Sequence, residues 1–321
     1  MPESPQMPDY KGLGTHYPPM LRPLRMALVS GLARVLLWLA GRLTVRGGQR
    51  VGRAMGSLVH ALSPRQRSLC GMQLAMALPE LGEEEHVRIA RECLRQQGMT
   101  LFELLAMPRI RARGERWVRL EGEDALREAH ARGKGVMLVT AHTGNWELIS
   151  VALARLGIKG VAMTSTHVNP QVNRLLGRLR RTEFIEIAER GSGDSPRRLL
   201  SALKGGQALV MACDVDIDTQ GVFVDFFGMP ANTPRAPASL ALKLGTPVVT
   251  YFDIREPDGT HTVRFAEVPV PDALREGPDP ALSLSQAISD AIEAHIRQFP
   301  SQWAWNHRRW KRRPASEQEQ S

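Results

Sequence analysis

The chain has 321 residues and a formal net charge of +9, with 42 Lys and Arg against 33 Asp and Glu. Its 43% hydrophobic and 23% charged residues are typical of a folded protein with a sizeable core, and they exclude a disordered chain. A basic surface suits nucleic acid, an anionic membrane surface or an acidic carrier protein. Because no helix-turn-helix, RNP-like or zinc-finger pattern is present, we expect no nucleic-acid partner.

The three cysteines, Cys70, Cys93 and Cys213, lie far apart and form no CxxC or Cys/His cluster. This spacing disfavours a disulfide framework and a structural zinc site. We expect three buried, free thiols and a reducing compartment.

The N-terminal part divides into three predicted regions. Residues 1–20 contain five prolines and no apolar period, so they are predicted to be a disordered tail without a cleaved signal peptide. Residues 21–48 are predicted to form an amphipathic, membrane-associated helix, with leucines on one face and Arg34 opposite. Because Arg34 interrupts the apolar run and arginines flank both ends, a helix lying in the interface fits better than a spanning one. An amphipathic helix packed on the protein's own core stays open as the alternative.

A helical region, 49–115, is predicted next, and Glu103 is expected on its surface. From residue 116 to 314, short apolar runs alternate with helical patterns, which predicts an α/β domain with a mostly parallel central sheet flanked by helices. Strands are expected at 116–121, 136–139, 161–165, 207–213, 248–254 and 261–268, and helices at 124–132, 171–181, 238–244 and 282–299. Residues 315–321 are predicted to be a polar tail.

The stretch after the apolar run 136–139 carries the strongest chemical signal. His142 follows the strand, Gly144 and Asn145 form a turn, and Glu147 begins the next helix. Open α/β sheets bind ligands at this end of their strands. A carboxylate beside an imidazole makes a directed general base, so His142 and Glu147 are candidates for a catalytic pair. On spacing alone, such a pair is more often a structural hydrogen-bonded pair, and the catalytic interpretation depends on the family resemblance described below.

Further polar groups follow the other predicted strands. Asn169 and Arg180 come after the strand 161–165, and Asp214 and Asp216 follow the strand 207–213. Alternating carboxylates suit a divalent cation, but the other positions of a calcium-binding loop are missing, so no metal is predicted. Arg235, at a helix start, suits a phosphate as well as solvent. Residues 221–228 are apolar and aromatic, which fits either an acyl-chain groove or a core strand.

The C-terminal segment, 300–314, combines aromatic and basic residues, which suits a membrane interface or anionic lipid head groups. A basic tail for nucleic acid is the weaker account. The residues assigned here to membrane or head-group contact are Trp303, Trp305, Arg308, Arg309 and Trp310.

Two of these motifs resemble a known family. His-x-x-x-x-Glu after an apolar strand resembles the signature of the glycerolipid acyltransferase superfamily. The Gly-Asn-Trp-Glu within it, and the terminal Pro-x-x-x-x-Trp-x-His-Arg-Arg-Trp-Lys, are similar to motifs of the late acyltransferases of lipid A biosynthesis. The resemblance runs from about residue 60 to 314.

The resemblance implies an acyltransferase at the cytoplasmic face of the inner membrane. It would move a fatty acyl group from acyl carrier protein to a hydroxyl of a lipid A precursor, with no cofactor, and His142 assisted by Glu147 would be the base. Two alternatives stay open: another acceptor, such as a lysophospholipid or glycolipid, and a non-catalytic membrane-surface binding module. The residues expected to bind substrate are Asn145, Asn169, Arg180, Asp214, Asp216 and Arg235.

Overall fold

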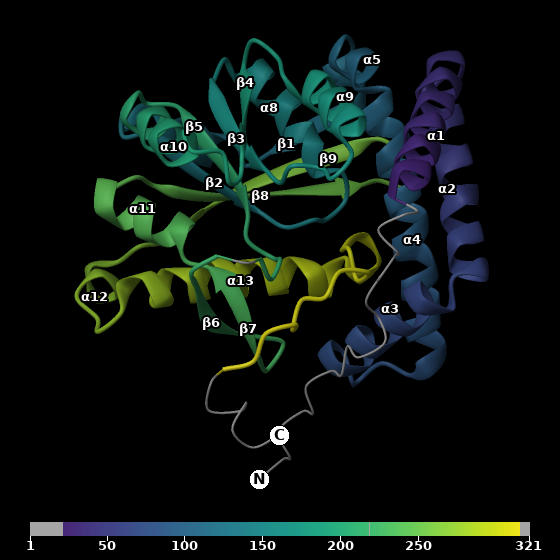
Figure 1. Ribbon diagram of the computed structural model, residues 1–321. Coiled ribbons are helices and arrows are strands. Elements are labelled where there is room, and N and C mark those ends of the chain that lie inside the picture. Colours follow the sequence, from purple (N-terminus) through teal and green to yellow (C-terminus); the bar gives the residue numbers. More distant parts are fainter. Residues whose placement is uncertain (1–21, 218, 315–321) are drawn as a thin grey trace.

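The structure is a computed structural model that describes residues 22–217 and 219–314. The tails predicted at 1–20 and 315–321 lie outside the described residues. Figure 1 shows a central sheet with helices on both faces and a group of N-terminal helices standing at one side.

The central sheet has seven strands in the order β1-β9-β8-β2-β5-β3-β4. Every neighbouring pair is parallel except β8 with β9, so the mostly parallel sheet predicted from the sequence is confirmed. Each expected strand is present in this sheet. The strands are β1 (Val118–Glu121), β2 (Val136–Thr140), β3 (Gly160–Thr164), β4 (Ile185–Glu189), β5 (Ala208–Ala212), β8 (Val248–Arg255) and β9 (His261–Val268).

Two strands were not predicted, β4 and β7. The second of these, β7 (Met229–Pro234), pairs only with β6 (Gly221–Phe226) in a separate antiparallel hairpin. Its prolines argue against a strand within a sheet, but a two-stranded ribbon leaves one edge of each strand without a ladder partner, where a missing N–H is tolerated.

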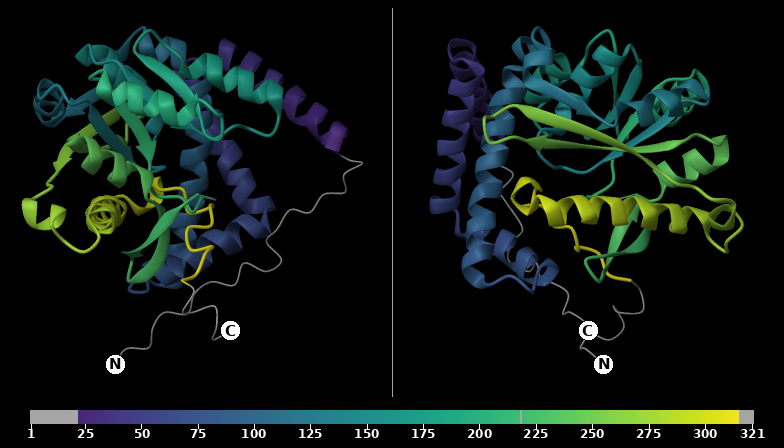
Figure 2. Two further views of the ribbon diagram at one scale, coloured as in Figure 1. Left: turned by 60° about the vertical axis from the view of Figure 1, so that its left-hand side comes forward. Right: turned by 180° about the vertical axis from the view of Figure 1, so that it is seen from behind.

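Alternating side chains of β2 separate two layers of core. Met137 and Val139 face one hydrophobic cluster, whereas Val136 and Leu138 face the other. Helices α10 (Ser195–Lys204), α11 (Ala236–Leu244) and α13 (Pro280–Gln298) cover the first face with the hairpin. Helices α7 (Glu123–Ala131), α8 (Ile149–Leu156) and α9 (Pro170–Arg180) cover the second, as the two views of Figure 2 show.

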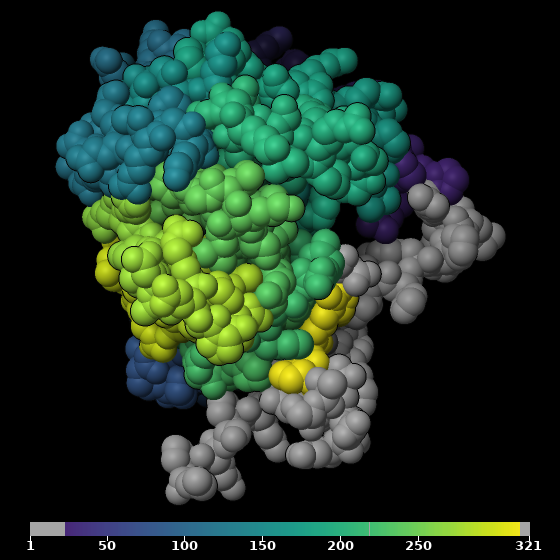
Figure 3. Space-filling view, turned by 90° about the vertical axis from the view of Figure 1, so that its left-hand side faces the viewer, coloured from purple at the N-terminus to yellow at the C-terminus, as the bar shows by residue number. Residues whose placement is uncertain are grey.

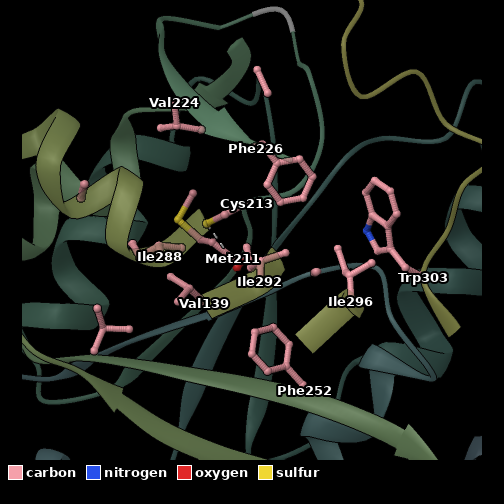
Figure 4. Packing of buried hydrophobic residues seen from close by; sticks show 14 of the residues in the cluster. Val139, Met211, Cys213, Val224, Phe226, Phe252, Ile288, Ile292, Ile296 and Trp303 are labelled. Atoms are coloured by element: carbon pink, nitrogen blue, oxygen red, sulfur yellow. Dashed lines mark hydrogen bonds between the residues drawn. The ribbon is translucent and has the colours of Figure 1, made fainter. Parts of the chain in front are cut away.

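The first cluster joins segments that are far apart in the sequence. Figure 4 shows Phe226 of the hairpin and Trp303 of the C-terminal segment packed with side chains of α13 and the sheet. The short helix α12 (Asp272–Arg275) precedes α13. All three cysteines are buried and free, as predicted.

The N-terminal helices are held together by close backbone contact. Added Cβ atoms at Gly52 and Gly98 would lie 2.2 Å and 2.1 Å from a carbonyl oxygen of the facing helix, so only glycine permits this approach of α2 to α4. The six helices are α1 (Arg22–Arg42), α2 (Val45–Leu62), α3 (Pro64–Ala77), α4 (Glu83–Leu105), α5 (Met107–Arg111) and α6 (Gly114–Trp117).

Helix α1 presents much of its apolar surface to solvent. Leu24, Leu28 and Leu32 are 55–65% exposed. Ser30 is buried and accepts a hydrogen bond from Asn169. The leucines in the first half of α1 are therefore not used for the protein's own core, whereas Leu36, Leu39 and Leu43, toward and just beyond its end, pack against the second cluster. Within the described chain, one helix is long and apolar enough to cross a membrane, and it is Pro23–Arg42 of α1.

Candidate active site

A cavity of about 480 Å³ opens where β2, β3 and β5 end. His142, Trp146, Glu147, Arg180 and Arg190 lie in its wall. This is the edge of the sheet at which ligands bind in open α/β folds, so the fold and the titratable groups point to the same place.

His142 pairs with Asp214 at this edge. Its Nδ1 lies 2.8 Å from Oδ1 of Asp214, and its main-chain N–H donates to Oδ2 at 2.8 Å. The pairing follows from the register of β2 and β5, in which Thr140 lies opposite Ala212. Each partner therefore stands two residues beyond the end of its strand, on neighbouring parallel strands.

Two C-terminal residues hold the Asp214 side of the pair. The indole N–H of Trp303 donates to Oδ2 of Asp214 at 2.8 Å, and Nε2 of His307 lies 3.1 Å from the Asp214 carbonyl oxygen. Asp214 is buried, while the His142 side chain is 29% exposed toward the cavity.

The electrostatics keep Asp214 ionised and set the tautomer of the neutral His142 ring. Burial alone raises the pKa of Asp214, but the charge and hydrogen bonds of His142 outweigh it and hold that pKa far below its usual range. Burial lowers the pKa of His142, yet the Asp214 carboxylate dominates and the net pKa is raised. Since a carboxylate only accepts, Nδ1–H of His142 must donate to it. That leaves Nε2, which has no partner among the described residues, as the proton acceptor toward the cavity.

The predicted pairing of His142 with Glu147 is corrected by this geometry. Oε1 of Glu147 instead accepts from Nε and Nη2 of Arg180, at 2.8 and 2.5 Å. Both side chains line the cavity, so the structure brings Glu147 and Arg180 to His142 as a neighbouring ion pair. The turn between His142 and Glu147 places both side chains in the wall of the same cavity. The carboxylate that pairs with the His142 ring is nevertheless Asp214, which follows the neighbouring strand β5.

The turn after His142 rests on a buried polar network. Asp253 accepts from the Asn145 N–H at 2.6 Å, and Glu103 accepts from Nδ2 of Asn145 at 2.9 Å. Thr100 donates to the Gly144 carbonyl oxygen at 2.9 Å. Asn145 is fully buried and does not line the cavity. Its hydrogen bonds therefore stabilise the turn from the protein interior.

Glu103 is only 1% exposed, which corrects its predicted place on a helix surface. Its carboxylate binds Arg255 from β8, and His261 from β9 lies 3.3 Å away. His261 also contacts Asp253 at 2.8 Å, and these two carboxylates raise its pKa to about 9 against the opposing effect of burial. The network therefore balances two carboxylates with two cations. Sequence periodicity marks α4 as a helix but does not show which strand ends meet it.

The C-terminal segment, 300–314, packs inside the protein next to the His142–Asp214 pair. Trp303, Trp305, Arg309 and Trp310 are buried, so the prediction that they contact membrane head groups is wrong. Arg308 is half-buried. On the face seen in Figure 3, this segment (yellow) reaches the surface as a narrow strip beside the green hairpin.

Specific bonds hold the segment in place. The Trp303 backbone forms an isolated bridge with Thr143, and the Ala304 N–H donates to the His142 carbonyl oxygen at 3.1 Å. Arg309 donates to the carbonyl of Asn232 and the hydroxyl of Thr233, both at 2.6 Å.

Three other predicted site residues lie away from the His142 cavity. Asn169 is buried, caps the N-terminus of α9 and donates to α1. Asp216 accepts from Asn232 and from the Arg312 N–H. Arg235 forms two hydrogen bonds with Asp279.

A second cavity, of about 500 Å³, adjoins the first and shares Met163, Arg190, Met211 and Ile217 with it. Leu199 and Leu240 add apolar surface, and Arg235 stands in its wall. The 221–228 element instead packs inward through Val222, Val224 and Phe226 in the core. Its interpretation as an acyl-chain groove is replaced by the core-strand alternative.

Arg190 was not singled out from the sequence. It follows β4, stands in both cavity walls and donates to Ser165 at 3.1 Å. Among the described residues it has no carboxylate partner, and burial lowers its pKa. The signal that would have found it is its place directly after a strand, which required β4 to be predicted.

The described segments 22–217 and 219–314 contain no group of three or more His, Cys, Asp or Glu arranged to hold a metal ion. The arrangement is suited to proton transfer by His142 beside two arginines. It resembles the base-and-carboxylate unit that activates a hydroxyl nucleophile.

Comparisons with known proteins agree with this chemistry. The family described as bacterial lipid A biosynthesis acyltransferase matches residues 16–312. A lipid A biosynthesis lauroyltransferase of Escherichia coli (strain K12) is 27% identical over 286 residues, 87% of this chain and 90% of the relative. A lipid A biosynthesis palmitoleoyltransferase of the same organism is 26% identical over 276 residues, 83% and 86% of the two chains. A phosphatidylinositol mannoside acyltransferase of Mycolicibacterium smegmatis is 26% identical over 193 residues, 58% of this chain and 60% of the relative.

Proposed function

Because the chain belongs to the bacterial lipid A biosynthesis acyltransferase family and is an acyltransferase, we propose that it transfers a fatty acyl group from acyl carrier protein to a hydroxyl of a lipid A precursor. The observation that carries this proposal is the His142–Asp214 pair at the wall of the cavity. In a family of acyltransferases, such a pair is the group able to activate a hydroxyl.

His142 is the proposed general base. Nε2 takes the acceptor hydroxyl proton while the oxygen attacks the thioester carbonyl. When the tetrahedral intermediate collapses, the new C–O bond remains, the C–S bond breaks, and the leaving thiolate receives the proton from the imidazolium. Asp214 fixes the Nδ1–H tautomer and stabilises the positive ring.

Glu147 keeps a role in this proposal through Arg180. Its carboxylate orients the guanidinium at the cavity wall, next to the base. Arg180 and Arg190 offer charge to the oxyanion of the intermediate or to a phosphate of either substrate. The apolar second cavity has the volume and character to take the acyl chain.

The donor and the location are also part of the proposal. The net charge of +9 suits an acidic carrier protein, whose association would then weaken with salt. The exposed leucines of α1 support attachment to a membrane, and the cytoplasmic face of the inner membrane is the location that we propose.

The test is acyl transfer in detergent micelles from acyl-loaded carrier protein to a tetra-acylated lipid A precursor. Transfer that is lost in His142→Ala and retained in the exposed-site control Asp225→Asn supports the proposal. Absence of transfer by the wild type to this acceptor contradicts it. Repeating the assay with acyl coenzyme A tests the donor.

A second acceptor class is favoured by one observation, the similarity to a phosphatidylinositol mannoside acyltransferase. A glycolipid acceptor keeps the same base and the same donor chemistry. Transfer to a mannoside, with none to the lipid A precursor, selects this alternative, whereas transfer to a lysophospholipid alone selects the lysophospholipid acceptor instead. The binding-module alternative is not retained, since the family consists of acyltransferases.

A further inference from the structure

A cavity separate from the active site lies between the α1–α2 junction and helices α5 and α6. It has a volume of about 680 Å³, and its wall contains the end of α1 and Trp117. Among the residues that the structure describes, no Asp or Glu lies in this wall. Five arginines line the cavity: Arg42, Arg46, Arg109, Arg113 and Arg116.

These arginines differ in whether they already have a hydrogen-bond or ion-pair partner within the protein. Arg109 donates to the carbonyl oxygens of Leu43 and Ala40, so it serves the end of α1. Arg46 is 3.7 Å from Asp258, in an exposed pair that solvent screens. Arg113 and Arg116 are exposed, and neither has a carboxylate partner among the described residues. The cavity therefore holds an excess of positive charge.

The position of the cavity relative to α1 indicates its ligand. Along α1, exposed leucines lead to Trp38, which is 59% exposed, and the guanidinium of Arg42 lies 4.9 Å from that ring. Exposed leucines followed by a tryptophan and arginines are the side chains that anchor a helix at the membrane–water interface. The joined ends of α1 and α2 stand beside α5 in Figure 1. The arginine cavity thus lies at the level of the lipid head groups if the leucine face enters the membrane.

We propose that this cavity binds the phosphate of an anionic phospholipid, held by Arg113 and Arg116 with Arg42 at the membrane side. Guanidinium groups bind phosphate oxygens in pairs, and basic pockets beside membrane helices are suited to anionic head groups. Such a lipid fixes the depth at which the protein sits on the membrane. The inference rests on the membrane association within the proposed function, and it does not depend on acyl transfer.

The test measures binding of the full chain to vesicles of phosphatidylcholine alone and of phosphatidylcholine with phosphatidylglycerol. The variant is Arg113→Gln with Arg116→Gln. The matched control is Arg127→Gln with Arg197→Gln, which removes the same charge from exposed positions on α7 and α10. An arginine near an anionic surface contributes about fivefold in partitioning, so the variant should lose roughly 25-fold of the preference for anionic vesicles. The control should keep most of it.

Each outcome decides the matter. Equal losses in variant and control overturn the proposal, because they show a general charge effect. An unchanged vesicle preference in the variant overturns it too; if the variant has then lost binding to acyl carrier protein, measured in parallel, the cavity is assigned to the carrier. Failure of the wild type to bind any vesicle removes the membrane association itself. Wild-type binding to neutral and anionic vesicles alike leaves that association in place and overturns this inference alone.

Discussion

Replacing Asp214 with asparagine tests the proposed catalytic pair, His142 and Asp214, most directly, because Asp and Asn side chains have nearly the same shape. In the structure, Oδ1 of Asp214 accepts from the His142 ring, while Oδ2 accepts from the His142 main-chain N–H and from Trp303. An asparagine has one oxygen and one NH₂ group. The oxygen is expected at the Oδ2 position, because there it satisfies two donors.

The NH₂ group then faces Nδ1 of His142 and donates to it. This forces the proton onto Nε2, which is the atom that must be unprotonated to act as a base. The stabilisation of the imidazolium by a carboxylate is lost as well. For a wrong tautomer of this kind we expect kcat to fall about 10³–10⁴-fold, or about 4–5.5 kcal/mol of transition-state stabilisation.

The assay is acyl transfer in micelles, with kcat and kcat/KM followed across pH. Since Asp214 raises the pKa of His142, the ascending limb of kcat/KM should also move to lower pH in the variant. Nitrogen NMR of the His142 ring reads the tautomer without substrate, and Asp225→Asn is the control on an exposed strand position. A kcat within tenfold of wild type for Asp214→Asn, together with a larger loss for Glu147→Gln, would refute the reasoning and restore Glu147 as the partner.

Four further single substitutions test other parts of the structure. Trp303→Phe removes the indole donor to the Asp214 carboxylate and should lower kcat about tenfold, whereas Trp305→Phe, whose indole donates to the Pro300 carbonyl, should not; steady-state kinetics compares them. Glu103→Gln leaves a buried guanidinium without its charge partner and should cost about 3–5 kcal/mol, measured by urea denaturation; a change below 1 kcal/mol contradicts this. Because folding raises the pKa of His261 to about 9, its stabilisation is complete below about pH 6.5 and is lost as pH rises through 9, so thermal stability should fall across that window and stay flat in His261→Gln. Arg190→Gln should raise KM about tenfold with little change in kcat if this unpaired cation binds substrate phosphate, and an unchanged KM for both substrates excludes that role.

The parts of the fold that the sequence predicts are those with local signals. Apolar runs predict β2 and β5 because both are buried on two faces, and the acids of the first turn mark α4. Strand β4 was not predicted because its five residues are too few to show a clear alternation of buried and exposed positions. Strand β7 was not predicted because its prolines argue against a strand. Such elements are decided by their neighbours.

The site divides in the same way. His142 and the cavity edge follow from a strand, a turn and a helix, all read from adjacent residues. Its partner Asp214 is 72 residues away and meets it only because β2 and β5 are neighbours. Strand order is not encoded in any single segment, so the nearer carboxylate, Glu147, looked like the partner. A correct prediction that β2 pairs with β5 would have identified Asp214, and not Glu147, as the partner of His142.

The C-terminal segment shows why composition alone misplaces a function. Tryptophans beside arginines suit a membrane interface, but they equally suit a buried strap in which indole and guanidinium donors meet carboxylates and carbonyl oxygens. Here Trp303 reaches Asp214 and Arg309 reaches the hairpin, so the last part of the chain completes the environment of a residue near its middle. The same basic and aromatic chemistry at the end of α1 stays exposed, beside leucines that the core does not cover. Burial distinguishes the two groups of aromatic and basic residues. The buried C-terminal motif holds Asp214 in place for the proposed proton transfer, whereas the exposed arginines at the end of α1 can bind the proposed lipid.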